Sequence, residues 1–289
     1  MILFSDCQKE IDIDAPHYEP KIVIDGWIEQ GGYAHVYVTL SSPFLTNYDS
    51  LSIVKTFLNF SKVTVTSGSG EREVLTLFKK NELFPPYIFR SVSLKGETGE
   101  SYLLEVNTRG KILTAETTIP EPPNALEGTF KYLSDSTGYP QVLLADPPNE
   151  MNYYLFYTKI IGYDNDFYPV KYPVLSDKYF DHSAPIEVNL YHGDKSNIRE
   201  YILSEDDPYE AFDNYEFLAR DSILIKCCSI DSVSFRVLNS VFFDILSAKN
   251  PFRSETAVME TNITGGIGRW TGMGIKYILL PGSDNKSLQ

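Results

Sequence analysis

Cysteine is scarce in this sequence, with Cys7, Cys227 and Cys228 as the three examples in 289 residues. Cys227 and Cys228 are neighbours, and neighbouring side chains on a β-strand point to opposite faces, so the two are poorly placed to bridge each other. They lie in the apolar run ILIKCCSI, which is typical of cysteines that act as small buried hydrophobic residues. The sequence therefore indicates no disulfide framework.

Positive charge and long apolar runs are also in short supply. The protein has 25 Lys and Arg residues against 39 Asp and Glu residues, which gives a formal net charge of −14. An acidic surface repels phosphate backbones, which argues against nucleic acid as a partner. No stretch approaches the roughly 18 apolar residues of a membrane span, so we expect no transmembrane helix.

Motifs that carry chemistry are missing as well. None of the four histidines forms an HxxxH or HExxH pair or lies near a cysteine at zinc spacing. The sequence contains no GxSxG, P-loop or Rossmann fingerprint. We therefore predict no catalytic residue and no cofactor, and we expect the protein not to be an enzyme.

Aromatic residues, by contrast, are abundant, and the 20 Tyr and 17 Phe favour β-structure. Residues 33–40 alternate strictly between two faces, which predicts a half-buried strand. Further strands are expected at 62–66, 73–78, 87–91, 102–106 and 111–118. About seven short strands without a helix indicate an immunoglobulin- or fibronectin-like β-sandwich over residues 20–120.

A proline-rich segment, IPEPP at 119–123, predicts a stiff linker, and residues 121–289 are expected to form a larger β-rich domain. Strands are expected at 142–144, 153–161, 186–190, 222–230 and 275–280. One helix is predicted near 233–248, where apolar residues recur at helical spacing. The glycine-rich run 264–272 is interpreted as a tight turn into the last strand. The predicted fold class is mainly β.

Two sets of polar residues are candidates for binding. Aromatic residues in polar loops suit sugar stacking or protein contacts, although packing within strands is the commoner explanation. The candidates are Tyr163, Tyr168, Tyr172, Tyr209, Tyr215 and Trp270. Acidic loop residues are weak calcium candidates, because neither stretch has EF-hand spacing: Asp164, Asp166, Asp206 and Asp207. A glycoside hydrolase would instead need two carboxylates about 5–10 Å apart, and the sequence places no pair at that distance.

The N-terminus opens with MILFSDCQKEIDID. Apolar residues followed by Ser5, Asp6 and Cys7 are typical of the end of a lipoprotein signal peptide, whose cysteine is acylated. The residues after this cysteine resemble the acidic tag of Bacteroidetes-type surface lipoproteins: Gln8, Lys9, Glu10, Asp12 and Asp14. Residues 1–19 are interpreted as a signal remnant and acidic tether. The alternative is a short tail with an incidental thiol, because the apolar segment is much shorter than a complete signal peptide needs.

Five segments, in the order CQKEIDID, PKIVIDGWI, VTLSSPF, DPPNEMNYY and NITGGIGRWTG, resemble the lipoprotein family called domain of unknown function 4249. The resemblance runs over nearly the whole sequence. It implies an outer-membrane lipoprotein of the Bacteroidetes type, anchored by lipid at Cys7. It also implies an association with TonB-dependent transporters, and it carries no catalytic residue over to this protein.

The leading hypothesis is therefore a surface-exposed outer-membrane lipoprotein that faces the cell exterior and is a non-catalytic accessory or ligand-binding component of a TonB-dependent nutrient uptake system. Its ligand would be a glycan or a peptide, and only its lipid anchor would contact the membrane. One alternative is an adhesin or structural cell-surface protein, which would associate with itself or with host proteins. The other is a hydrolase built from loop carboxylates.

Overall fold

The computed structural model describes residues 18–42, 53–81, 85–145, 150–180, 184–193, 216–247 and 260–283. Within these ranges the protein is mainly β, with one long α-helix, which confirms the predicted fold class. The strands arise from alternation: in β1 every second residue is buried, because Ile22, Ile24 and Ile28 face a core while Asp25 and Trp27 face the other way.

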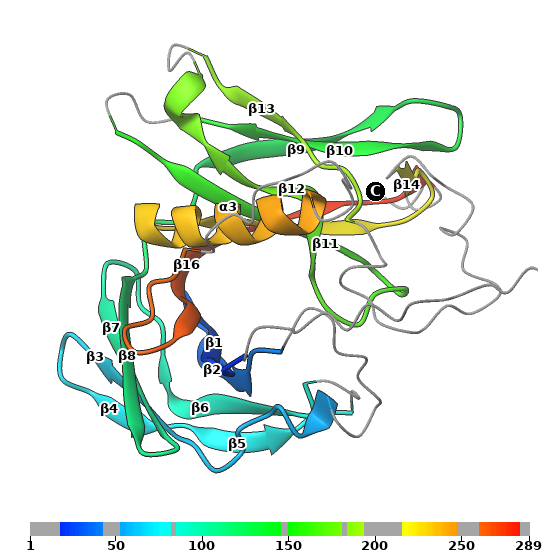
Figure 1. Cartoon of the computed structure of the whole chain (residues 1–289). Coiled ribbons are helices and arrows are strands. Elements are labelled where there is room, and N and C mark those ends of the chain that lie inside the picture. The colour runs from blue at the N-terminus through cyan, green and yellow to red at the C-terminus, as the bar shows by residue number, and fades with distance from the viewer. Residues whose placement is uncertain are drawn as a thin grey trace, which may run out of the picture.

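An eight-stranded sheet runs through the whole molecule (Figure 1). Its strands, in spatial order, are β12 (Tyr168–Ser176), β11 (Tyr153–Ile160), β15 (Ile223–Ser229), β16 (Ile267–Leu280), β1 (Ile22–Glu29), β2 (Tyr33–Leu40), β6 (Tyr87–Lys95) and β5 (Thr76–Lys79). Figure 1 shows the sheet running from β5 and β6 at the bottom of the view up to β11 and β12, which lie below β9, β10 and β13.

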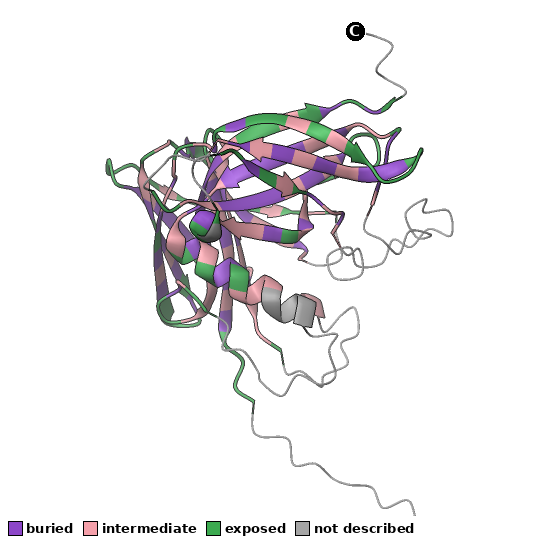
Figure 2. Ribbon diagram, turned by 90° about the horizontal axis from the view of Figure 1, so that it is seen from above, coloured by how far each residue is buried: buried purple, intermediate pink, exposed green. Residues whose placement is uncertain are grey.

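Two smaller four-stranded sheets pack on one face of the large sheet and create two sandwiches. The first consists of β4 (Arg72–Val74), β3 (Lys62–Ser67), β7 (Ser101–Thr108) and β8 (Lys111–Thr118). The second consists of β13 (Ile186–Asn189), β10 (Thr137–Leu144), β14 (Phe217–Leu218) and β9 (Ala125–Tyr132). The first sandwich encloses a core around Trp270, and the second encloses a core around Phe156 and Phe217. Figure 2 shows the buried residues of both sandwiches in purple.

The strand β16 belongs to both sandwiches. Its first half pairs in parallel with β1, up to the pair Glu29 and Met273, and its second half pairs antiparallel with β15. The proline-rich linker crosses this strand closely: a Cβ on Gly274 would lie 2.2 Å from the carbonyl oxygen of Pro120. The part of the sequence after residue 120 therefore contributes a strand to the first sandwich, and the boundary at residue 120 stays a prediction.

The helix α3 (Ser232–Ser247) covers part of the opposite face of the large sheet and lies close to the predicted range 233–248. Phe235 and Leu238 pack there against residues such as Met273. Asp231 caps the helix, because its Oδ1 accepts a hydrogen bond from the Ser234 backbone N–H at 2.6 Å. A short 3-10 helix, η1 (Asp177–Tyr179), follows β12.

Three local predictions meet different outcomes. Cys227 and Cys228 are free and buried, and they face different cores, as strand alternation predicts. The predicted strand 73–78 is interrupted at Leu75, which divides it into β4 and β5 in two different sheets. The interpretation of 264–272 as a turn is wrong for most of its length, because β16 begins at Ile267.

Candidate functional site

The large sheet has a face that neither smaller sheet covers, and aromatic and basic side chains gather there. We call it the aromatic–basic face. It consists of Asp25, Trp27, Glu29, Tyr33, His35, Tyr37, Phe78, Arg90, Lys95, Tyr157, Lys226, Arg269 and Thr271. These residues share one face because paired residues on neighbouring strands point the same way, while the residues between them are in the cores.

One row of this face crosses four neighbouring strands. Thr271 on β16 is paired with Trp27 on β1, Trp27 with His35 on β2, and His35 with Arg90 on β6. The rings of Trp27 and His35 are stacked, with centroids 5.1 Å apart and planes at 14°. Three members carry a buried polar atom without a hydrogen-bond partner: Thr271 Oγ1, His35 Nδ1 and Arg90 Nε. Buried polar atoms without a partner are unusual in a folded protein, and here three of them lie in one row.

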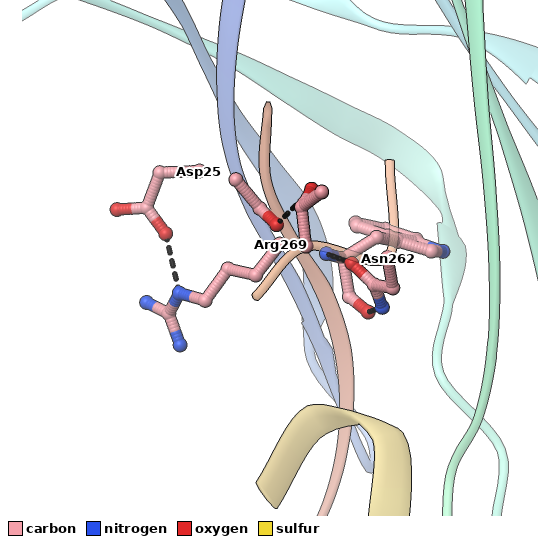
Figure 3. Close-up of polar contacts among 6 residues, drawn as sticks. Asp25, Asn262 and Arg269 are labelled. Carbon is pink, nitrogen blue, oxygen red and sulfur yellow. Dashed lines mark hydrogen bonds and ion pairs between the residues drawn. The ribbon is translucent and has the colours of Figure 1, made fainter. Parts of the chain in front are cut away.

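Two ion pairs lie beside this row. Arg269 Nε donates to Asp25 Oδ1 at 2.6 Å, and Figure 3 shows the two side chains meeting to the left of the strands. Lys226 on β15 donates to Glu29 on β1, although β16 lies between these strands. The Lys226 side chain is 8% exposed and that of Arg269 18% exposed. The long Lys226 side chain therefore reaches across β16 to meet Glu29.

The local environment fixes the charge of these groups. Burial lowers the pKa of His35, so the imidazole is neutral at pH 7. Burial alone would lower the pKa of Lys226 too, but attraction to neighbouring negative groups, including Glu29, raises it above its usual value. Burial would also lower the pKa of Arg269, but attraction to Asp25 outweighs burial and raises it. Both cations are therefore permanently charged at physiological pH.

Arg90 and Lys95 carry charge without a carboxylate partner among the residues that the structure describes. The Arg90 guanidinium lies over the ring of Phe78, 4.3 Å from its centroid, and 5.6 Å from that of Tyr33. Lys95 Nζ lies 5.3 Å from the Tyr33 centroid. The rings hold both cations by cation–π attraction, which leaves hydrogen-bonding capacity for a ligand.

Trp270, a residue expected to bind ligand, is fully buried in the first core and offers no ring surface to a ligand there. Its indole N–H donates to the Tyr102 carbonyl oxygen at 2.9 Å. The side-chain amide of Asn262 makes the two hydrogen bonds that a neighbouring strand would make with Trp270. The Trp270 backbone N–H donates to Asn262 Oδ1, and Asn262 Nδ2 donates to the Trp270 carbonyl oxygen (Figure 3). The segment NITGGIGRWTG therefore has a structural role at the edge of β16.

The expected tyrosine group is dispersed along one edge of the sheet. Tyr163 is exposed in the turn after β11, while Tyr168 and Tyr172 lie in β12 rather than in a loop. Asp164 is buried, and its Oδ2 accepts a hydrogen bond from the Ile160 backbone N–H at 2.7 Å, so it stabilises that turn. Asp166 is exposed.

Several candidates lie outside the described residues: Cys7, Gln8, Lys9, Glu10, Asp12, Asp14, Asp206, Asp207, Tyr209 and Tyr215. Within the described ranges, no three His, Cys, Asp or Glu side chains gather as a metal site would require. No helix there is long and apolar enough to cross a membrane.

The sequence predictions missed the aromatic–basic face, although one signal for it was present. The outward residues of β1 are Asp25, Trp27 and Glu29, and those of β2 include Tyr33 and His35. A strand that only needs solubility carries Thr, Lys or Glu on its outer face, so large aromatic rings at period two indicate a contact surface.

Comparisons with solved structures find likenesses of low overall similarity. A two-domain fibronectin type III segment of chicken tenascin is 11% identical with a TM-score of 0.21, and the match spans 73% of this protein and 91% of that segment. A cytokine receptor complex is 9% identical with a TM-score of 0.23, and the match spans 91% and 98% respectively. Salmonella alpha-2-macroglobulin is 10% identical with a TM-score of 0.23, and the match spans 98% of this protein but 16% of that one.

The comparison with protein families is decisive for membership. Among curated proteins, none matches this sequence significantly. The family profile described as domain of unknown function (DUF4249), in contrast, matches residues 8–276. This match includes nearly every strand described above, from β1 to most of β16. The protein therefore belongs to the DUF4249 family.

Proposed function

We propose that the protein is a lipid-anchored outer-membrane protein that captures a nutrient ligand at the cell surface and passes it to a TonB-dependent transporter without chemical turnover. The aromatic–basic face carries the ligand-binding part of this proposal. Aromatic rings and unpaired cations on one sheet face suit binding, because rings offer large contact area and cations select charged groups.

The anchoring part rests on the sequence around Cys7. An acylated cysteine followed by an acidic tag would tether the protein to the outer leaflet and leave the sandwiches in the medium, where a nutrient is first met. One acyl group gives marginal membrane binding, so stable anchoring needs more than one at the cysteine. The net charge of −14 disfavours electrostatic attachment to an anionic membrane surface and leaves the lipid as the attachment.

The first experiment is a pull-down of the native protein after extraction from membranes, with mass spectrometry of its partners and of the peptide that contains Cys7. We expect an acylated Cys7 and a co-purifying TonB-dependent transporter. An unmodified Cys7 together with the absence of an outer-membrane partner would refute the accessory-lipoprotein proposal.

A matched pair of variants separates anchoring from folding. Cys7→Ser should release the protein from the membrane fraction and leave its thermal stability unchanged. Cys227→Ala changes a buried thiol in the second core and should leave the protein in the membrane fraction. If Cys7→Ser stays membrane-bound at high salt, the lipid anchor is not what holds the protein.

A further inference from the structure

The charge on the aromatic–basic face differs from that of the whole protein. The protein has a net charge of −14, yet this face combines four cations with two carboxylates. Asp25 and Glu29 are each paired with one cation, which leaves Arg90 and Lys95 as an excess of positive charge. An excess of this sign in an acidic protein indicates that the ligand at this place is an anion.

Arg90 is the residue best prepared for such an anion. Its guanidinium makes no ion pair or hydrogen bond with another described residue, and its Nε is buried without a partner. The ring of Phe78 supports one flat side of the guanidinium, so the edge formed by its two terminal nitrogens is left for a planar acceptor. A carboxylate matches this edge, since it accepts two parallel hydrogen bonds from one guanidinium.

The neighbouring rings indicate what carries the carboxylate. Trp27 lies two strands away from Arg90 along the same row, at a distance of about 10 Å. The central strands β1 and β2 are hydrogen-bonded on both sides, so their backbones have no ladder position to offer to a peptide. A saccharide needs no such ladder, and its flat apolar ring faces pack on aromatic side chains.

We propose, on the basis of the ligand-binding function proposed above, that this face binds oligosaccharides that carry a carboxylate, such as uronic or sialic acid units. Arg90 receives the carboxylate, and Lys95 adds attraction at the same end. Trp27 is half-buried, and the part of its ring that His35 and the apolar residues under α3 leave open packs against a second sugar unit.

The test is isothermal titration calorimetry of the full-length protein with three acidic probes: tri-galacturonate, a hyaluronan tetrasaccharide and 3′-sialyllactose. Methyl-esterified tri-galacturonate and lactose are the neutral controls. We expect at least one acidic probe to bind at least tenfold more tightly than its neutral counterpart, and its affinity to fall as salt is raised.

Two variants locate the site. Arg90→Met keeps an apolar stem over Phe78 and removes the charge, and it should weaken binding of the acidic probe at least tenfold. Arg72→Met is the matched control, because Arg72 is an exposed arginine on β4 that pairs with Glu105 in another sheet. It should change affinity less than twofold. Equal melting temperatures of the two variants and the wild type exclude an effect through unfolding.

Fluorescence gives an independent readout at the other end of the row. The protein has two tryptophans, and Trp270 is fully buried, so a change in emission on ligand binding reports on Trp27. Trp27→Phe should abolish the change and weaken binding. Equal binding of acidic and neutral probes, or unchanged binding in Arg90→Met, would overturn the carboxylate assignment and leave ligand capture in place. Failure of all three acidic probes to bind at millimolar concentration would also overturn it, while the pull-down decides the proposed function separately.

Discussion

Replacing Gly268 with alanine should disrupt the junction of the two sandwiches. Gly268 lies in the half of β16 that pairs with β1, opposite Ile24, and its φ is +116°. An added Cβ would stand 1.8 Å from the carbonyl oxygen of Ile24 and 3.0 Å from its nitrogen. These are backbone atoms of a buried strand, so no flexible side chain can turn away to make room.

The cost has two parts. A positive φ costs a residue with a Cβ about 1–2 kcal/mol. Relieving the overlap requires β1 and β16 to separate by about 1 Å or more, which weakens their ladder and the packing of Ile24 by about 2–3 kcal/mol. Gly268→Ala should therefore lower the free energy of unfolding by about 4 kcal/mol. For a protein of this size, that corresponds to a fall in melting temperature of about 8–16 °C.

Gly70→Ala is the matched control. Gly70 also has a positive φ, of +95°, but a Cβ there would meet nothing within 4 Å. This variant bears only the conformational cost, about 1–2 kcal/mol. The assay is thermal and urea unfolding of both variants, followed by circular dichroism at equal protein concentration. A difference between the two variants of less than about 1 kcal/mol would show that the strands are not as close as argued.

Three further predictions concern charges and a helix cap. Glu73 accepts hydrogen bonds from three consecutive backbone N–H groups of β6. Burial raises the pKa of Glu73, but these hydrogen bonds outweigh burial and lower it. Glu73→Gln should therefore lower the free energy of unfolding by about 1 kcal/mol at pH 7, after allowance for solvent screening. A lowered carboxyl pKa gives stability that is present above the unfolded-state pKa and is lost as pH falls through the folded-state value, so urea titrations should show the difference disappearing in acid. Lys226→Met should lower the free energy of unfolding by about 3 kcal/mol, because it leaves Glu29 without its cation. The pKa of Lys226 is raised, so its contribution to stability persists at neutral pH and is lost only when pH rises through the folded-state pKa. Equal stability of the variant and the wild type at pH 7 would contradict the pairing. Asp231→Ala removes the cap of α3 and should lower the free energy of unfolding by about 1–2 kcal/mol, with a smaller loss for Asp231→Asn. Thermal unfolding compares the two variants.

The elements that the sequence predicts well are those with a local signal. Strict alternation locates β2, the predicted strand 111–118 coincides with β8, and helical spacing locates α3 to within a residue at each end. The opposite orientation of Cys227 and Cys228 follows from the same period of two. Each of these patterns is complete within one segment, so the rest of the fold is not needed to interpret it.

The parts that were missed depend on pairing between distant segments. Asp25 and Arg269 are 244 positions apart, and Lys226 and Glu29 are 197 positions apart, so no local window contains either ion pair. Glycines are usual in turns, which explains why the sequence predicts a turn at 264–272. In the structure, Gly268 is needed for a different reason, namely the close approach of Ile24 in the parallel ladder.

The same parallel ladder connects the candidate site to the cores. In β16, Trp270 points into the first core, while Arg269 and Thr271 on either side of it point to the aromatic–basic face. Because Trp270 is fully buried and both of its backbone polar groups are held by Asn262, the strand has little freedom to shift or rotate at this position. Thr271 is paired with Trp27 on β1, so Trp27 lies beside a strand with a fixed backbone position, and a ligand that binds at Trp27 needs to order few groups. By this reasoning Asn262→Ala should weaken binding of an acidic probe more than its effect on stability alone explains, although Asn262 lies outside the aromatic–basic face.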